Sequence, residues 1–262
     1  MKTAAIAIPV YREKLTADEE ISFRQLRHFL SAYDIYFVAP EGLRVPDKNI
    51  PVKFFDKKYF TGLGSYSQLL ISPKFYQEFQ EYQYVLVYQL DALVFSDRLL
   101  EWCEKGYDYI GAPWLAGALP PNDPRGNAVG NGGFSLRKVS SFLKTLENYK
   151  YSRSVFSGLA DAGRVLIERW KYLSFKQWIN AFRWKFFMVP IFGHILVEDY
   201  FWSFEAKRHN PDFNIAPVSE ALRFAFENNP SYCFGQNHHE LPFGCHAWPK
   251  YDRKFWEQHL LK

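Results

Sequence analysis

Short apolar runs alternate with a helical periodicity along the first third of the chain. Residues 3–10, 34–39 and 50–55 are apolar runs bounded by Pro or Gly, and each predicts a strand. Between the first two runs, hydrophobic residues recur at helical spacing as far as Tyr33. The segment 16–19 (Thr-Ala-Asp-Glu) fits a capping box that would begin this helix. Strand, helix and strand in this order predict βαβ units and a parallel sheet.

A further apolar run, residues 84–95, carries one carboxylate. Its residues 85–87 (Val-Leu-Val) are typical of a strand buried on both faces, and Asp91 falls where such a strand should end. Ligands of open α/β sheets bind outside the carboxyl ends of the strands. Asp91, preceded by the polar Gln89, is therefore a candidate ligand for a metal ion or a nucleotide sugar. On local grounds, a carboxylate that caps the following turn or helix is an equal alternative.

The next segments continue the alternation. Helices are predicted over about 66–80, with a kink or break at Pro73, and over about 97–105. Residues 107–110 predict a strand. A helix over about 138–149 completes this half of the chain.

Glycines gather just before the strand predicted near Phe134. Residues 129–137 contain three glycines within four positions. Glycine permits positive φ and lets a ligand approach the backbone closely. A β-bulge or a tight turn explains the same pattern without a ligand.

Residues 150–190 differ from the rest because cations alternate with aromatic side chains. The basic aromatic part, 164–187, is compatible with a helix that lies on an anionic membrane surface or meets a lipid-linked substrate. The alternative is a helical insertion, at about 150–195, whose aromatic residues pack on the core and whose cations face water.

Two later segments carry candidate chemistry. Glu198 and Asp199 open another predicted helix, where acidic residues also suit the positive end of the helix dipole. His246 lies in an aromatic segment after His238 and His239. A single His in such a setting is more often a packed, hydrogen-bonded residue than a metal ligand, and no compact zinc spacing is present.

Composition narrows the class of protein. The chain has 262 residues, of which 48% are hydrophobic, and its mean hydropathy is −0.29. These values suit one α/β domain over residues 1–262, with an insertion. A net charge of +4 is too weak to argue for nucleic acid. Three cysteines without CxxC spacing fit a reducing compartment, and no apolar stretch is long enough for a membrane span. We therefore expect a cytoplasmic protein, peripheral at the inner face of the membrane through residues 164–187.

Four motifs in this order resemble the GT-A class of glycosyltransferases. They are residues 89–91 (Gln-Leu-Asp), 130–137 (Gly-Asn-Gly-Gly-Phe-Ser-Leu-Arg), 198–202 (Glu-Asp-Tyr-Phe-Trp) and 243–248 (Phe-Gly-Cys-His-Ala-Trp). More narrowly, they resemble a family of candidate glycosyltransferases known only as a domain of unknown function. The resemblance implies a GT-A-like, Rossmann-like fold, with a mostly parallel central sheet flanked by helices.

The resemblance also implies roles for residues. Donor binding is expected at Pro9, Tyr11, Arg12, Gln89 and Asp91, with Tyr11 stacked on the nucleobase. Acceptor binding is expected at Trp114, Asn131, Gly132 and Gly133, with Trp114 stacked on the acceptor sugar. A divalent cation, Mn or Mg, would be held by Asp91 and His246. Asp199 is the candidate general base, and Glu198 is the alternative.

One departure from the family pattern affects the metal. The DxD motif of most metal-dependent members is Gln89-x-Asp91 in this chain, which removes one carboxylate. Arg12 or Lys58 would supply positive charge in place of a tightly bound cation.

The expected function is transfer of a sugar from a nucleotide sugar to a saccharide or a lipid-linked saccharide. We expect the reaction to be inverting and to serve cell-surface polysaccharide or glycoconjugate synthesis. Two alternatives stand beside it. One is a non-catalytic protein that binds carbohydrate or nucleotide, and the other is a metal-dependent hydrolase using Asp91, His238, His239 and His246.

Overall fold

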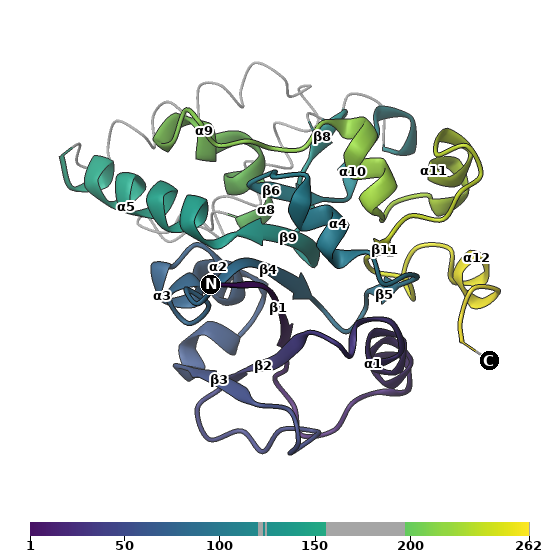
Figure 1. Ribbon diagram of the computed structural model, residues 1–262, viewed down its shortest axis with the longest axis horizontal. Helices are drawn as coiled ribbons and strands as arrows, with labels where there is room; N and C mark the ends of the chain where they lie inside the picture. The colour runs from purple at the N-terminus through teal and green to yellow at the C-terminus, as the bar shows by residue number, and fades with distance from the viewer. Residues whose placement is uncertain (120–122, 124, 156–196, 262) are drawn as a thin grey trace, which may run out of the picture.

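The computed structural model describes residues 1–119, 123, 125–155 and 197–261 (Figure 1). Most of the insertion expected at about 150–195, and all of the membrane contact expected at 164–187, lie outside these residues. The residues of the insertion that are described, 150–155, continue helix α5 (Val139–Val155).

A six-stranded sheet forms the centre of the described structure, in the order β3-β2-β1-β4-β9-β6. The strands are β1 (Lys2–Pro9), β2 (Asp34–Pro40), β3 (Val52–Phe55), β4 (Tyr82–Tyr88), β6 (Tyr109–Gly111) and β9 (Phe134–Lys138). Only β9 runs against its neighbours, β4 and β6, so the sheet is mostly parallel. The predicted fold class is thereby confirmed, including the helices on both faces described next.

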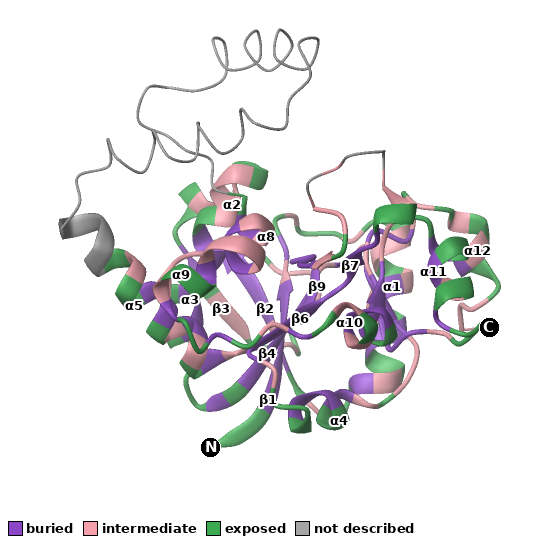
Figure 2. Ribbon diagram, turned by 90° about the horizontal axis from the view of Figure 1, so that it is seen from above, coloured by how far each residue is buried: buried purple, intermediate pink, exposed green. Residues whose placement is uncertain are grey.

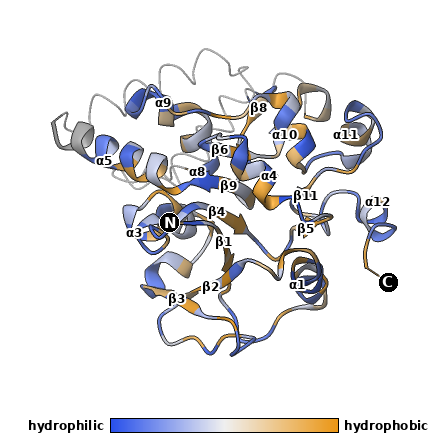
Figure 3. Cartoon of the chain, in the orientation of Figure 1, coloured by the Kyte–Doolittle hydropathy of each residue, from blue (hydrophilic) through white to orange (hydrophobic). Residues whose placement is uncertain are grey.

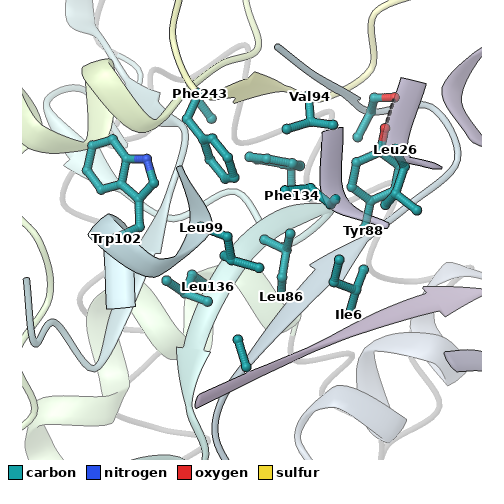
Figure 4. Packing of buried hydrophobic residues seen from close by; sticks show 14 of the residues in the cluster. Ile6, Leu26, Leu86, Tyr88, Val94, Leu99, Trp102, Phe134, Leu136 and Phe243 are labelled. Carbon is teal, nitrogen blue, oxygen red and sulfur yellow. Dashed lines mark hydrogen bonds between the residues drawn. The ribbon is translucent and has the colours of Figure 1, made fainter. Parts of the chain in front are cut away.

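One face of the sheet packs against α1 (Ala17–Leu30), α4 (Leu99–Glu104) and α10 (Val218–Phe224). In Figure 4, Ile6, Leu86 and Leu136 from three strands lie with Leu26 of α1 and Trp102 of α4. Side chains alternate between the two faces of a strand, so the intervening residues of β4 serve the other face. Figure 3 shows that β1 and β4, which lie in the centre of the sheet, are largely hydrophobic.

The other face packs against α2 (Leu63–Leu70), α3 (Pro73–Gln77), α5 and a helical run near the end of the chain. This run consists of α8 (Glu198–Tyr200), a π-helical turn (Phe201–Glu205) and α9 (Ala206–His209). Figure 2 shows that the strands are mostly buried, whereas the outer surfaces of the helices are exposed. Helices on both faces make three layers, as expected when a sheet must bury both sides.

Two helices begin where the sequence predicts. The capping box is present: Glu19 N donates to Thr16 Oγ1 (3.3 Å), and Thr16 N donates to Glu19 Oε2 (2.7 Å). The helix predicted over 66–80 is two helices, and the second begins at Pro73, after Ser72 accepts a bond from Lys74 N (3.3 Å). Proline suits a first helical position because its missing N–H has no partner there anyway.

A second, smaller sheet joins the end of the chain to the segment after β4. It contains β10 (Ala225–Phe226), β11 (Gly244–Cys245) and β5 (Leu93–Val94), and it is accompanied by α11 (Pro230–Gln236) and α12 (Arg253–Glu257). The remaining short elements are β7 (Pro113–Trp114), β8 (Ala128–Val129), and the 3₁₀ turns Lys57–Phe60 and Ala116–Ala118. Two-residue strands are too short to show a hydrophobic period, so the sequence did not predict this sheet.

Its core is a separate hydrophobic cluster, here called the C-terminal cluster. The members are Leu93, Leu115, Leu222, Phe226, Cys233, Cys245, Trp248 and Trp256. This cluster fixes the segment that carries His246. None of the helices within the described ranges is both long and apolar enough to cross a membrane.

Candidate active site

Three of the four sequence motifs meet at the carboxyl end of β4. Gln89 N donates to Gly133 O (2.8 Å), and Gln89 Oε1 lies 3.1 Å from His246 Nε2. Asp91 Oδ1 lies 3.3 Å from the same nitrogen. Trp248 N donates to Asp91 O (3.0 Å), which ties the last motif to the turn after β4. The structure therefore brings Gln89, Asp91 and His246 together across 157 residues of sequence.

His246 has a carboxylate on each side of its ring. Glu227 Oε1 lies 3.2 Å from Nδ1, opposite the Asp91 side, and the His246 side chain is only 14% exposed. Burial lowers the pKa of His246, but the hydrogen bonds and charges of Asp91 and Glu227 outweigh it and raise the pKa to about 10. Burial raises the pKa of Asp91, yet its bond to His246 holds that pKa below the ordinary value. At neutral pH the ring is a cation between two anions.

Sequence reasoning missed Glu227. It is an isolated acidic residue directly after β10, the two-residue strand whose Phe226 O accepts a hydrogen bond from His246 N (2.9 Å). An isolated acidic residue in the sequence does not indicate a role at the site. Glu227 is identified only in the folded chain, where the pairing of β10 with β11 brings it to His246.

The donor atoms around His246 fit a divalent cation. Ligands on one face of an octahedral site lie about 3 Å apart, close to the separations from His246 Nε2 to Gln89 Oε1 and Asp91 Oδ1. Asp91 Oδ1 is buried and has His246 Nε2 as its partner at 3.3 Å, and the Glu227 contact to Nδ1 is the carboxylate–histidine arrangement common behind metal-ligating histidines. Within the described ranges, no three His, Cys, Asp or Glu side chains form such a group. The third donor is the Gln89 amide, so such a site would contain one carboxylate.

Glu198 is held in a buried ion pair. Its Oε1 lies 2.6 Å from Arg137 Nη2, and only 3% of Glu198 is exposed. Burial lowers the pKa of Arg137, but the charge of Glu198 raises it well above the ordinary value, so the guanidinium stays charged. Arg137 belongs to the glycine motif, and the sequence assigned it no role.

Asp199 is half-buried beside Glu198. Burial raises its pKa well above the ordinary value, and the charge and hydrogen bond of Glu198 raise it further, while His246 opposes them. Asp199 therefore holds a proton more tightly than an ordinary aspartate does, which makes its carboxylate a stronger base.

The glycine turn, residues 130–133, separates the acidic pair from His246. A Cβ on Gly132 would collide with the carboxylate oxygens of Glu198 and Asp199, and a Cβ on Gly133 would collide with the His246 ring. Asn131 Oδ1 accepts a bond from Gly133 N (3.0 Å) and holds the turn. None of these glycines has a positive φ, so the positive φ suggested as their purpose is wrong. They are needed because two groups of the site approach the backbone closely.

Trp114 and Asn131 are both buried. The Trp114 ring is 4% exposed and stacks on Phe204 (6.4 Å between centroids, 4° between planes), while the Arg125 guanidinium lies 5.4 Å from its centroid. Stacking of Trp114 on an acceptor sugar stays a prediction, and it requires these neighbours to move.

The expected donor residues lie at the same edge of the sheet. Ala7 pairs with Val87, so Pro9 at the end of β1 leaves the sheet beside Gln89. Tyr11 is 60% exposed, as a nucleobase platform requires, and the Arg12 guanidinium lies 4.7 Å from its ring centroid.

Positive charge in this region is partly neutralised. Arg12 Nη2 lies 3.3 Å from Glu19 Oε1, and Lys58 Nζ lies 3.0 Å from Asp56 Oδ2. The sequence analysis did not predict Lys250 as a residue of the site. A hydrogen bond with Tyr251 raises the pKa of Lys250 most, and the charges of Glu227 and Asp91 raise it further. This exposed cation is therefore near the Asp91 side of the site.

The hydrolase alternative needs His238 and His239 near Asp91. Both residues follow α11 and have left-handed backbone conformations, and His239 packs edge-on against Phe234 (5.4 Å). The absence of a metal-binding group of three among the described His, Cys, Asp and Glu residues also counts against this alternative.

The fold is similar to that of a solved glycosyltransferase involved in the glycosylation of the major capsid of PBCV-1. The identity is 9%, the TM-score is 0.50, and 98% of each chain is covered. The glycosyltransferase GlyE of Streptococcus pneumoniae TIGR4 matches with 12% identity and a TM-score of 0.46, over all of this chain and 61% of that one. No curated protein matches the chain. The family model described as "Protein of unknown function (DUF5672)" matches residues 49–246, and the chain belongs to that family.

Proposed function

We propose that the chain is a glycosyltransferase that moves a sugar from a nucleotide-sugar donor to a saccharide or lipid-linked saccharide acceptor, with inversion. One observation carries this proposal: the Gln89–Asp91–His246 group and the Glu198–Asp199 pair meet across the glycine turn. An inverting transfer needs a group that stabilises the leaving diphosphate and a base for the attacking hydroxyl. The first group would stabilise the diphosphate and the second would supply the base, with Gly132 and Gly133 between them.

The donor would bind on the β1 and β4 side. The exposed ring of Tyr11 would stack on the nucleobase, and Pro9 and Arg12 would line the same edge. The diphosphate would lie toward Asp91, where Lys250 contributes positive charge and protonated His246 adds to it when no metal ion is bound. A Mn²⁺ or Mg²⁺ ion held by Gln89, Asp91 and His246 would, when bound, stabilise the charge on the leaving diphosphate.

The acceptor would bind on the other side of the glycine turn. Asp199 would take the proton of the attacking hydroxyl, because Glu198 is already engaged with Arg137. Trp114 and Asn131 would border this side. We also propose that residues 164–187 bring the enzyme to a lipid-linked acceptor at the membrane surface, in the assembly of a surface polysaccharide or glycoconjugate.

The first test is binding and turnover of nucleotide sugars. A panel of UDP-, GDP- and dTDP-sugars would be titrated by calorimetry with and without Mn²⁺, and hydrolysis and transfer would be followed by release of the nucleotide. We expect at least one donor to bind and its transfer to depend on an added saccharide. If no nucleotide sugar binds, the proposal is wrong. Binding without any turnover supports the non-catalytic alternative.

The second test is Asp199→Asn. We expect this change to lower kcat by about 10²–10⁴-fold, the usual contribution of a general base, while the donor still binds. The control is Asp212→Asn, because Asp212 is exposed and its ion pair with Lys144 lies at the surface. Full activity in Asp199→Asn would remove Asp199 from the mechanism.

A further inference from the structure

Arg137 is a charged side chain with no contact to solvent. It lies on β9, and its guanidinium donates to Ser135 Oγ (3.0 Å), Tyr76 Oη (2.9 Å) and Gly132 O (3.1 Å), in addition to the ion pair with Glu198. Burial of two charges is expensive, and apolar residues of similar volume often stabilise a core as well or better. An ion pair at this depth therefore calls for a reason other than stability.

The partners of Arg137 come from three separate parts of the site. Tyr76 is on α3, Gly132 is in the glycine turn, and Glu198 is the first residue of α8. The planar guanidinium fixes the direction of each bond, which a lysine cannot do. One side chain thus sets the glycine turn and the start of α8 relative to each other.

The ion pair also decides what Glu198 can reach. Its Oε1 is engaged with the Arg137 guanidinium, and its Oε2 borders the backbone of Gly132. The neighbouring Asp199 is less buried, and it too borders Gly132.

We propose that Arg137 and Glu198 are a positioning pair, which fixes the first turn of α8 against the glycine turn so that Asp199 faces the reacting hydroxyl. This inference rests on the proposed function, and it adds that Glu198 does not exchange protons with substrate.

The pair makes a specific prediction for the pH dependence. The titratable groups that face Asp199 are Glu198 beside it, Tyr66 of α2, Tyr109 of β6, and Glu227 and His246, which directly follow β10 and β11. Glu198 is the one of these that raises the pKa of Asp199 most. Loss of its charge should therefore move the acidic limb of the rate profile to lower pH.

The experiment compares Glu198→Gln, Arg137→Lys and Asp199→Asn, with Arg223→Met as a control for loss of an arginine in a surface ion pair. For Glu198→Gln we expect kcat to fall by about 10²-fold or less, the cost of a displacement near 1 Å, with an unchanged donor KM and the acidic limb at lower pH. Arg137→Lys should lower kcat and leave the donor KM unchanged. Asp199→Asn should keep its kcat about 10²–10⁴-fold below the wild-type value at every pH.

If Glu198→Gln transfers no sugar above the wild-type rate without acceptor, and Asp199→Asn is active, the proposal is wrong and Glu198 is the base. An unshifted acidic limb in an active Glu198→Gln would also overturn it. Titration of the Asp199 carboxyl by ¹³C NMR needs no substrate, so it separates this inference from the proposed function. The midpoint should fall in Glu198→Gln, and an unchanged midpoint counts against the pair.

Discussion

Glu198 and Asp199 are adjacent residues of similar chemistry, yet their surroundings give them opposite effects on stability. Arg137 compensates the charge of Glu198, whereas the charge of Asp199 is opposed by burial and by Glu198. The sequence could place both acids at a helix start, but it could not tell them apart, because the distinction depends on a cation 61 residues away from Glu198 in the chain.

Asp199→Asn should stabilise the protein at neutral pH. Because the pKa of Asp199 is raised in the folded state, the unfolded chain releases its proton first as the pH rises above about 4. The free energy of unfolding therefore decreases as the pH rises from that value to the pKa of Asp199 in the folded state. Asn cannot ionise, so the Asp199→Asn variant does not show this decrease. Urea unfolding should show a gain in the free energy of unfolding at pH 7 and little gain below pH 4. A gain that is equal at both pH values would contradict the assigned cause.

Glu198→Ala should have the opposite effect. It leaves the Arg137 guanidinium buried without its counter-ion, a change that typically costs about 3–5 kcal/mol. Chemical denaturation at pH 7 measures the loss directly. The matched control is Glu220→Ala, which breaks the more exposed ion pair with Lys105 and should cost about 1 kcal/mol or less.

At the scale of elements, the glycine turn is where sequence interpretation was only partly correct. The cluster of glycines was recognisable, and the following strand, β9, begins at Phe134. The reason for the glycines was not recognisable, because the groups that approach them come from α8 and from the segment after β11. Local sequence can indicate that a backbone position must have no side chain, but it cannot indicate which groups pack against that position.

Gly132→Ala should displace the start of α8. Its Cβ would meet the carboxylates of Glu198 and Asp199, and overpacking of this kind costs about 1–3 kcal/mol. We expect lower thermal stability and a large fall in kcat. Gly235→Ala is the control, because no atom lies within 4 Å of a Cβ at that position. Wild-type activity in Gly132→Ala would show that α8 can move without consequence.

At the scale of the molecule, the central sheet was predictable and the second sheet was not. Strands β1 to β4 have apolar runs, and helices follow β1 and β3, so the alternation of strands and helices predicts a parallel sheet. The second sheet depends on pairings such as Gly244 with Val94, between segments far apart in the chain. The site needs both sheets, so the sequence identified candidate residues for it without the contacts that join them.

Trp256→Ala tests how the second sheet supports the site. Trp256 is fully buried and stacks on Phe95 (5.4 Å between centroids, 10° between planes), within the core that also holds Trp248. We expect a loss of about 3–5 kcal/mol in the free energy of unfolding and weaker donor binding, because His246 is no longer held beside Gln89. Calorimetric titration with the donor below the unfolding transition separates the two effects. Unchanged donor affinity would show that His246 is held by other contacts.

The contact between Gln89 and His246 has a consequence for the order in which the protein is made. It closes a loop of 157 residues, and the four strands β1 to β4 are complete long before His246 leaves the ribosome. A partly synthesised chain can therefore form most of the parallel sheet before His246 can join Gln89 and Asp91. Contacts between distant segments form slowly, since the entropy of closing the loop must be overcome first. In refolding, burial of the early strands should precede the return of nucleotide-sugar binding.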